Sequence, residues 1–228
     1  MPPSHYQRER EFWDSKGANA YVSLSPFDQQ RILSWIAAGP EVRRCLDLGG
    51  GSGMTAKMLA ASGMPFLVCV DISAAMLRHS GLPSVQGDAL RLPFADASFD
   101  LVVAAAFLHH VPGLERDVLR ECVRVIRPGG RIVGYDPSAR CVQNRIFMGD
   151  GRFRLRSFSP DERPIDPRHL VAKLGEVGFH DASVHLFSFR NSRLTLFEGI
   201  QRWMLDPISV GPLRHWLQRW FFWSAKRL

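Results

Sequence analysis

A glycine-rich turn constrains this chain most, because it joins an apolar strand directly to a helix. Residues 43–48 are predicted to form the strand and residues 53–61 the helix. Gly49, Gly51 and Gly53 permit positive φ angles and remove the Cβ atoms that would keep a ligand away from the main chain. Because the first turn of a helix attracts polar and anionic groups, this turn predicts a nucleotide-type ligand site.

Strands and helices alternate on both sides of this turn. The predicted strands are continuous apolar runs, as expected when helices cover both faces of a parallel sheet, at 43–48, 66–71, 84–87, 99–105 and 131–135. The predicted helices lie at 4–16, 26–37, 53–61, 73–80 and 112–126. This order predicts an α/β fold with a mostly parallel sheet and helices on both faces.

The regular alternation stops after Pro137. Residues 138–166 are rich in proline and arginine, and we interpret them as an insertion over the ligand site. Residues 166–177 are predicted to form a helix, and residues 182–189 and 194–197 an antiparallel pair of strands.

Composition narrows the class of protein. A chain of 228 residues is long enough for one α/β domain, and no apolar run approaches the roughly 20 residues that span a bilayer. We therefore expect a cytoplasmic protein. The four cysteines have no C-x-x-C spacing, which favours buried free thiols and predicts no metal site.

The net charge of +7 is unevenly distributed. Residues 1–138 contain 14 Lys and Arg against 14 Asp and Glu, whereas residues 139–228 contain 15 against 8. A basic carboxy-terminal part indicates an anionic substrate, an anionic membrane surface or nucleic acid, and a merely solubilising surface is the alternative.

Acidic residues end two of the predicted strands beside the glycine turn. Asp71 ends strand 66–71 and Asp88 follows strand 84–87, so both lie at the edge of the sheet where open α/β proteins bind ligands. Asp71 is suited to accept hydrogen bonds from two ribose hydroxyls, and Asp88 from an adenine amino group. Each could instead be a helix cap or turn residue.

The joint pattern resembles the class I S-adenosylmethionine-dependent methyltransferases, in the small-molecule group that includes the ubiquinone and menaquinone methyltransferases. The resemblance covers about residues 40–136 in order and spacing. The segments that carry it are Leu46-Asp47-Leu48-Gly49-Gly50-Gly51-Ser52-Gly53, Val70-Asp71-Ile72-Ser73, Gly87-Asp88-Ala89-Leu90, Phe99-Asp100-Leu101-Val102, Leu108-His109-His110-Val111 and Arg127-Pro128-Gly129-Gly130.

The resemblance implies a seven-stranded sheet and S-adenosylmethionine as cofactor. It also implies a role for each matching residue. The methionine end of the cofactor would be held by Asp47, Gly49, Gly51 and Gly53, and from the fourth strand by Ala105. The ribose would be bound by Asp71, the faces of the adenine by Ile72 and Met76, and its edge by Asp88 and Ala89. Tyr21 would close over the cofactor.

The resemblance implies an enzyme that methylates an oxygen, nitrogen or carbon of a small hydrophobic or anionic molecule. Residues 1–40 would close the cofactor site, residues 41–137 would bind the cofactor, and residues 138–228 would form an acceptor lobe within a single domain. Two alternatives stay open: an enzyme on this fold that uses the cofactor without methylating, and a noncatalytic membrane-binding or partner-binding protein. A dinucleotide site is disfavoured because Met54 stands where G-x-G-x-x-G requires its last glycine.

His109, His110 and Asp136 are the candidate catalytic residues. Histidine titrates near neutral pH, and the histidine pair follows the fourth predicted strand at the rim of the site. Either histidine could remove a proton from the acceptor, and Asp136 could orient the acceptor. Packing, helix capping and turn formation are the competing roles.

The carboxy-terminal segment 212–228 has an amphipathic pattern at helical period. Aromatic and apolar side chains gather on one side of the helical wheel, with Phe222 as the exception. We expect a helix that packs on the domain or on a second copy, lies on a membrane surface, or covers a hydrophobic substrate. Nucleic acid is disfavoured, because aromatic and basic residues fall on opposite faces.

Overall fold

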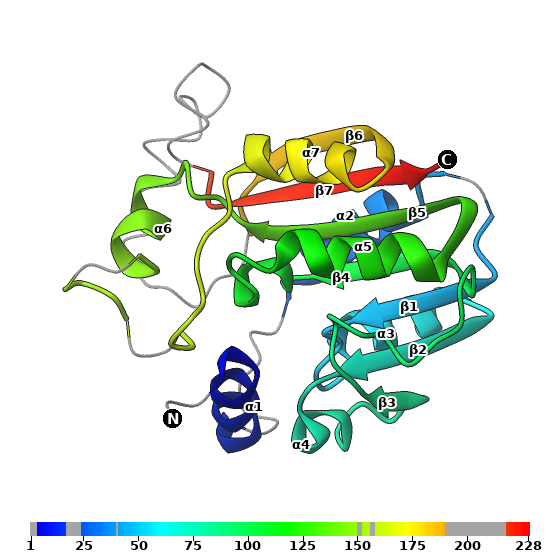
Figure 1. The fold of residues 1–228 in the computed structure, drawn as a ribbon, viewed down its shortest axis with the longest axis horizontal. Helices are drawn as coiled ribbons and strands as arrows, with labels where there is room; N and C mark the ends of the chain where they lie inside the picture. The colour runs from blue at the N-terminus through cyan, green and yellow to red at the C-terminus, as the bar shows by residue number, and fades with distance from the viewer. Residues whose placement is uncertain (1–3, 17–23, 40, 150–151, 156–157, 190–217) are drawn as a thin grey trace.

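Seven strands form one mixed sheet in the computed structural model, which describes residues 4–16, 24–39, 41–149, 152–155, 158–189 and 218–228. The strand order is β3-β2-β1-β4-β5-β7-β6, and only β7 runs antiparallel to its neighbours (Figure 1). The strands are β1 Arg44–Leu48, β2 Phe66–Asp71, β3 Ser84–Gln86, β4 Phe99–Ala105, β5 Ile126–Pro137, β6 Phe179–Phe187 and β7 Trp220–Arg227. The predicted α/β class and mostly parallel sheet are confirmed.

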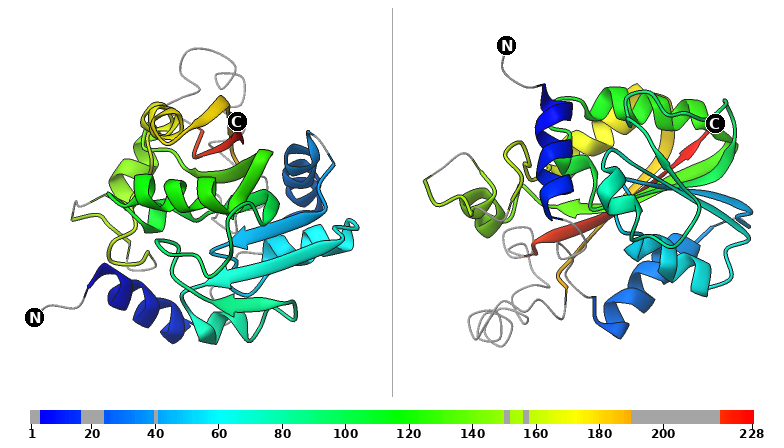
Figure 2. Two further views of the ribbon diagram at one scale, coloured as in Figure 1. Left: turned by 45° about the vertical axis from the view of Figure 1, so that its right-hand side comes forward. Right: turned by 90° about the horizontal axis from the view of Figure 1, so that it is seen from below.

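Helices cover both faces of this sheet (Figures 1 and 2). They are α1 His5–Lys16, α2 Pro26–Ala37, α3 Met54–Ala61, α4 Ala74–Leu77, α5 Glu115–Val125, α6 Val142–Phe147 and α7 Pro167–Glu176. One apolar core joins the sheet to α5 and α7, and a second joins the opposite face to α2 and α3. Helices α2, α3, α5 and α7 therefore bury their apolar side chains against strands that are apolar on both sides.

Several predicted boundaries differ from the structure, including those of α4, α5 and β5. Helix α4 ends at Leu77 and is shorter than the predicted helix 73–80, and α5 begins at Glu115 rather than at Pro112. Strand β5 is longer than predicted, because Ile126 already pairs with β4 before an irregularity in the register near residues 127–130.

The predicted amphipathic helix 212–228 is wrong over the described residues 218–228, where residues 220–227 form β7. This strand lies between β5 and β6, and its side chains enter the apolar cores on both faces of the sheet. Phe221 and Trp223 enter the core on the α5 side, whereas Trp220 and Phe222 enter the core on the α2 side. The strand period of two thus accommodates Phe222, which the helical wheel could not. Residues 212–217 and 194–197 lie outside the described residues.

The predicted helix 166–177 corresponds to α7, and the predicted strand 182–189 to β6. Strand β6 pairs with β7 rather than with the predicted segment 194–197. In place of a separate helical lobe, the described carboxy-terminal residues complete the sheet. No helix among the residues described is both long and apolar enough to cross a membrane.

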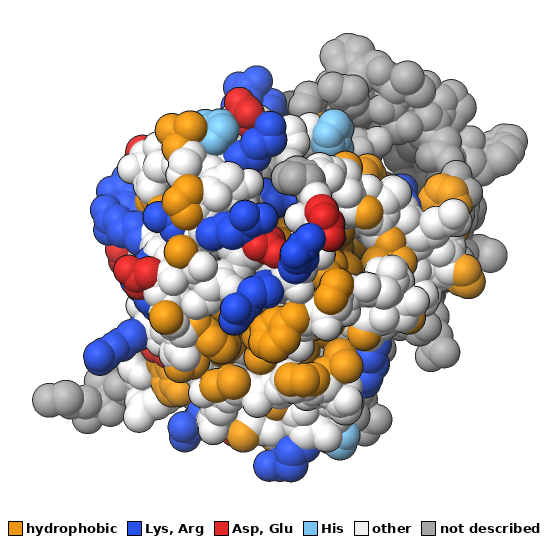
Figure 3. Space-filling model, turned by 90° about the vertical axis from the view of Figure 1, so that its right-hand side faces the viewer, with side chains coloured by type: hydrophobic (Ala, Val, Ile, Leu, Met, Phe, Trp, Pro, Cys, Tyr) orange, Lys and Arg blue, Asp and Glu red, His pale blue; other side chains and the backbone are white. Residues whose placement is uncertain are grey.

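The parallel strands end at one edge of the sheet, where α1 also lies (Figures 1 and 2). Figure 3 shows the opposite edge, where Lys and Arg side chains are scattered among apolar and acidic ones. The chemistry-bearing residues predicted from the sequence all fall at the first edge, except Tyr21, which lies outside the described residues.

Candidate active site

The glycine turn has the conformation that its sequence predicts. Gly49, Gly51 and Gly53 have φ angles of 68°, 53° and 78°, and Gly53 is the amino-terminal cap of α3. The N–H groups of Gly49 and Gly50 donate to the carbonyl of Val70, which ties the turn to β2. A Cβ on Gly49 would lie 2.1 Å from the Phe107 ring, so only glycine fits at that position.

Asp47 is a buried carboxylate directly beneath the turn. Its Oδ2 has no hydrogen-bond partner among the described residues. Burial raises the pKa of Asp47 to about 7, and the charge of Asp71 adds to this, although a hydrogen bond from the backbone of Ala56 opposes it. The side chain is therefore suited to accept a cationic or hydrogen-bonding group.

Asp71 ends β2 and accepts backbone hydrogen bonds on both carboxylate oxygens. Oδ2 accepts from Gly51 at 2.9 Å and Oδ1 from Ser73 at 2.8 Å. Burial raises the pKa of Asp71 above its usual value despite these bonds. Ser73 in turn donates to Asp14 of α1 at 2.5 Å, so α1 is attached beside the predicted ribose position.

The other predicted cofactor residues lie along the same edge. Met76 is buried, and Ile72 and Ala89 are half-buried. Asp88 Oδ1 accepts from the N–H of Leu90 at 2.9 Å, which is the turn-forming role that the sequence left open. Ala105 ends β4 and precedes Ala106, whose φ of 52° is uncommon for a residue other than glycine.

The structure brings His109 and Asp136 together at the carboxyl ends of β4 and β5. His109 Nδ1 lies 2.8 Å from Asp136 Oδ1, and the His109 backbone N–H donates to the same oxygen at 3.2 Å. The second oxygen, Oδ2, accepts from Trp223 Nε1 at 2.9 Å. Because both residues are almost fully buried, Asp136 fixes the orientation of the imidazole ring.

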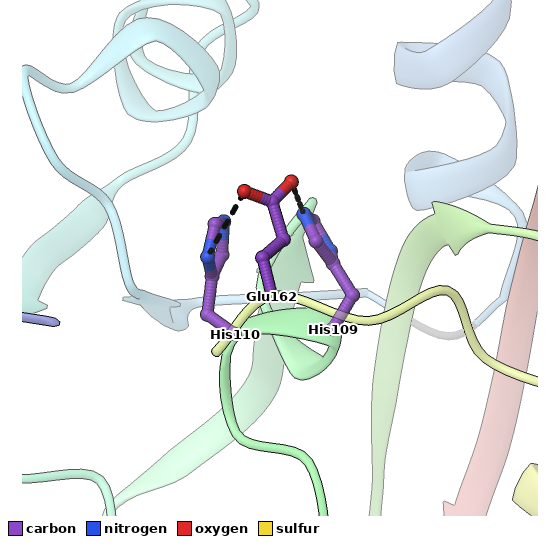
Figure 4. A group of neighbouring side chains, drawn as sticks. All are labelled: His109, His110 and Glu162. Carbon is purple, nitrogen blue, oxygen red and sulfur yellow. Dashed lines mark ion pairs between the residues drawn. The ribbon is translucent and has the colours of Figure 1, made fainter. Parts of the chain in front are cut away.

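Glu162 lies between the two histidines (Figure 4). Its Oε1 is 3.3 Å from His109 Nε2, and its Oε2 is 4.0 Å from His110 Nδ1. Glu9 of α1 approaches from the other side, with Oε2 3.5 Å from His110 Nδ1. Three carboxylates from separate parts of the chain therefore surround two imidazoles.

The pKa values follow from this arrangement. Burial alone would lower the pKa of His109, but the hydrogen bonds to Asp136 and Glu162 outweigh it and raise the pKa to about 9. Burial would raise the pKa of Glu162, but the two histidines lower it to about 2. Burial likewise opposes ionisation of Glu9, and its contact with His110 keeps its pKa below the usual value. The cluster therefore holds positive charge on His109 at neutral pH.

Helix α1 places this histidine cluster close to the predicted ribose position. Asp14 contacts Ser73 near Asp71, while Glu9 contacts His110. Five helical residues span about 7.5 Å. The two ends of the site are thus separated by a distance that one nucleoside-containing ligand can bridge.

Sequence reasoning missed the two glutamates and the tryptophan of this cluster. Glu9 lies in a polar helix and Glu162 in the irregular segment after β5, where neither has a neighbouring motif. Trp223 was assigned to a helix face. Their only shared signal is burial of a polar group, which the fold alone reveals.

Residues 46–134 match the family model of the methyltransferase domain. Residues 46–134 thus carry a class I S-adenosylmethionine-dependent methyltransferase domain. The chain is 47% identical over 124 residues to a demethylmenaquinone methyltransferase of Mycobacterium sp. (strain KMS), an alignment that covers 50% of this chain and 51% of the relative. A relative of the same name from Corynebacterium urealyticum is 40% identical over 100 residues, covering 42% and 41%. The chain thus spans about half the length of these curated relatives.

Solved structures support the same fold. A SAM-dependent methyltransferase from Archaeoglobus fulgidus aligns with a TM-score of 0.66 and 22% identity over 88% of this methyltransferase chain and 93% of its own. The [4+2]-cyclase SpnF aligns with a TM-score of 0.66 and 16% identity, and the alignment covers 99% of this chain and 97% of the cyclase. At these identities the likeness concerns the fold alone.

Proposed function

We propose that this protein transfers a methyl group from S-adenosylmethionine to a small, hydrophobic, hydroxylated aromatic molecule of the quinol type. The main support for this acceptor is the buried His109–Asp136 pair, which lies beside aromatic side chains that include Trp220. The names of the relatives, demethylmenaquinone methyltransferases, favour a quinone-derived acceptor.

The residues at the strand ends suit the cofactor. We propose that Asp71 binds the ribose, that Asp88 and Ala89 bind the adenine edge and that Ile72 and Met76 flank the ring. Gly49, Gly51, Gly53 and Ala105 would hold the methionine end, and Tyr21 would close over the cofactor. The buried, unpartnered Oδ2 of Asp47 supports this fit, because the amino group of the methionine end would supply the missing partner. When bound, S-adenosylmethionine supplies an electrophilic methyl group.

His109 would act on the acceptor oxygen. Its raised pKa favours the imidazolium form, which donates a hydrogen bond and stabilises an oxyanion. A phenol bound here would therefore lose its proton to water more readily, and the oxygen or ring carbon of the resulting phenolate would be the better nucleophile. A ring carbon that takes the methyl group would then also lose its own proton to water. Asp136 keeps the imidazole oriented, and His110 extends the same positive region.

Aromatic rings border the histidine cluster on the β7 side. The Trp220 ring lies 6.3 Å from His109, and the rings of Phe189 and Tyr135 lie 5.1 and 5.8 Å from Trp220. Edge-to-face contacts of this kind suit a flat apolar ring. We propose that residues 138–166 complete the acceptor end within a single domain, since Glu162 contacts His109 from that segment.

Calorimetric titration with S-adenosylhomocysteine tests the cofactor part. We expect saturable binding to the wild type and a loss of at least about tenfold in Asp71→Asn, because two hydrogen-bond acceptors for the ribose are weakened. The exposed Asp117→Asn is the matched control and should bind as the wild type does. Equal binding by all three proteins would contradict the assignment.

Mass analysis of the product tests the reaction. Incubation with S-adenosylmethionine and a 1,4-naphthoquinol should add one CH₂ to the quinol. A quinol converted without this gain would favour a non-methylating enzyme on the same fold. Cofactor binding with no turnover of any acceptor in a screen with labelled methyl donor would favour the noncatalytic alternative.

A further inference from the structure

The group formed by His109, His110 and Glu162 has the composition of a transition-metal site. Each residue offers one ligand atom, and these atoms all lie within 4.8 Å of one another (Figure 4). Two imidazoles and a carboxylate form the donor set of many catalytic zinc sites and of non-haem iron sites. The sequence predicted no metal site, because the four cysteines have no C-x-x-C spacing.

The distances between the donor atoms suit a four-coordinate ion. Ligand atoms bound at about 2.0–2.2 Å in a tetrahedron lie roughly 3.4 Å apart. His109 Nε2 and Glu162 Oε1 are 3.3 Å apart, and His110 Nδ1 and Glu9 Oε2 are 3.5 Å apart. The 4.0 Å between His110 Nδ1 and Glu162 Oε2 requires only a small side-chain shift.

Glu9 provides an independent observation. It is only 4% exposed, and its Oε1 has no hydrogen-bond partner among the described residues. A buried carboxylate oxygen without a partner costs free energy that a bound cation would offset. Glu9 contacts His110 through its other oxygen, so the unpartnered atom lies in the same cluster.

Asp136 supplies the outer support that metal-bound histidines usually have. It accepts from His109 Nδ1 at 2.8 Å, which leaves Nε2 of the same ring directed at Glu162. A carboxylate on the far nitrogen fixes the tautomer and orientation of a ligating imidazole. Asp136 is itself held by Trp223, so the support is rigid.

We propose that His109 Nε2, His110, Glu162 and Glu9 bind one divalent transition-metal ion of the Zn²⁺ or Fe²⁺ class. The three buried carboxylates of the cluster, Glu9, Asp136 and Glu162, would be balanced in part by the ion instead of by a proton on His109, which is a neutral imidazole when it binds a metal. For the proposed methyl transfer, on which this last step rests, the ion would take the acceptor oxygen as a fifth ligand and act as a Lewis acid in place of the His109 imidazolium.

Metal titration of the full chain tests the site. The protein is first treated with a chelator and then titrated with Zn²⁺ by calorimetry, and with Co²⁺ by visible absorption. We expect one ion per chain and the absorption bands of four-coordinate Co²⁺. The Glu162→Gln and half-buried His110→Ala variants should each bind roughly tenfold more weakly or worse. His180→Ala, which removes a histidine that pairs with Asp181 on β6, is the control and should bind as the wild type does.

Two results would overturn the proposal. One is the absence of stoichiometric binding to a wild type that unfolds cooperatively, and the other is equal affinity in the wild type, Glu162→Gln and His110→Ala. The titration contains no methyl donor, so its failure would leave the proposed methyl transfer untouched. Conversely, absence of a methylated product would not affect the metal site.

Discussion

Replacing Asp47 by asparagine should make the stability of this protein less dependent on pH. The buried carboxyl has a pKa of about 7 in the folded protein, against its usual value of 3.8. The folded state therefore keeps a proton that the unfolded chain has lost between these two pH values. The stabilisation is fully present below about pH 3.8 and is lost as pH rises to about 7.

The magnitude follows from this difference. Each pKa unit is worth about 1.4 kcal/mol, so ionised Asp47 costs the folded protein roughly 4 kcal/mol above pH 7. Asp47→Asn cannot ionise, and its amide places a donor where Oδ2 lacks a partner, which adds an offset that does not vary with pH. The difference in unfolding free energy between variant and wild type should rise by about 1.4 kcal/mol per pH unit from pH 4 to pH 7.

Urea unfolding of both proteins at several pH values measures this difference. Asp100→Asn is a matched control, because the pKa of Asp100 is shifted in the opposite direction to that of Asp47. Although burial opposes it, hydrogen bonds from the backbone of Arg43 and Arg44 and the charge of Arg127 lower the pKa of Asp100. The stabilisation that ionised Asp100 gives the folded protein is present above the usual pKa of aspartate and is lost as pH falls through the lowered pKa. The Asp100→Asn substitution should therefore destabilise the protein at neutral pH and destabilise it less in acid.

A pH-independent difference between Asp47→Asn and the wild type would refute the reasoning. Addition of S-adenosylhomocysteine provides a second readout. If Asp47 binds the cationic amino group, the ligand should flatten the pH profile of the wild type and leave that of Asp47→Asn unchanged. An equal effect of the ligand on both profiles would place the amino group elsewhere.

Further substitutions test the packing of the sheet. Gly134→Ala should destabilise by about 3 kcal/mol, because its Cβ would lie 2.5 Å from the carbonyl of Ala104 and from the indole of β7. Gly175→Ala in α7 meets nothing within 4 Å and should stabilise by roughly 0.5–1 kcal/mol. Arg131→Met should cost about 2 kcal/mol, because the buried guanidinium donates to the carbonyls of Ile36 and Ala38 after α2. Urea midpoints measure all three, and a Gly134→Ala protein as stable as the wild type would contradict the packing of β5 against β7.

The sequence predicted the cofactor half of the fold closely, because its signals are local. Strands β2 and β4 have the predicted bounds, since each is a continuous apolar run with a polar or small residue at its end. The glycine turn also agrees, because its backbone angles depend on a few neighbouring residues.

Prediction failed for β7 because the aromatic run at 220–223 fits two periods. On a helix it leaves Phe222 on the polar side, and in a strand it alternates between two cores. The strand form is selected by β5 and β6, which pair with both edges of β7, and by the two cores that bury its side chains on either face of the sheet. No local propensity encodes that outcome, and tertiary packing overrides the helical pattern.

The methyl-donor half of the candidate site is encoded by local sequence motifs, whereas the proposed acceptor half is assembled by tertiary packing. This difference bears on which acceptor the protein selects. The predicted donor residues fall almost entirely in the contiguous stretch that the family model covers, residues 46–134. The proposed acceptor cluster joins His109 and His110 to Glu9, Asp136 and Glu162, and these three carboxylates all lie outside that stretch. Relatives can therefore share every donor motif and still differ at the atoms that would meet the acceptor. Substitutions at Glu9 or Glu162 should change acceptor choice or metal affinity while leaving S-adenosylhomocysteine binding intact, a separation that substitutions in the glycine turn would not produce.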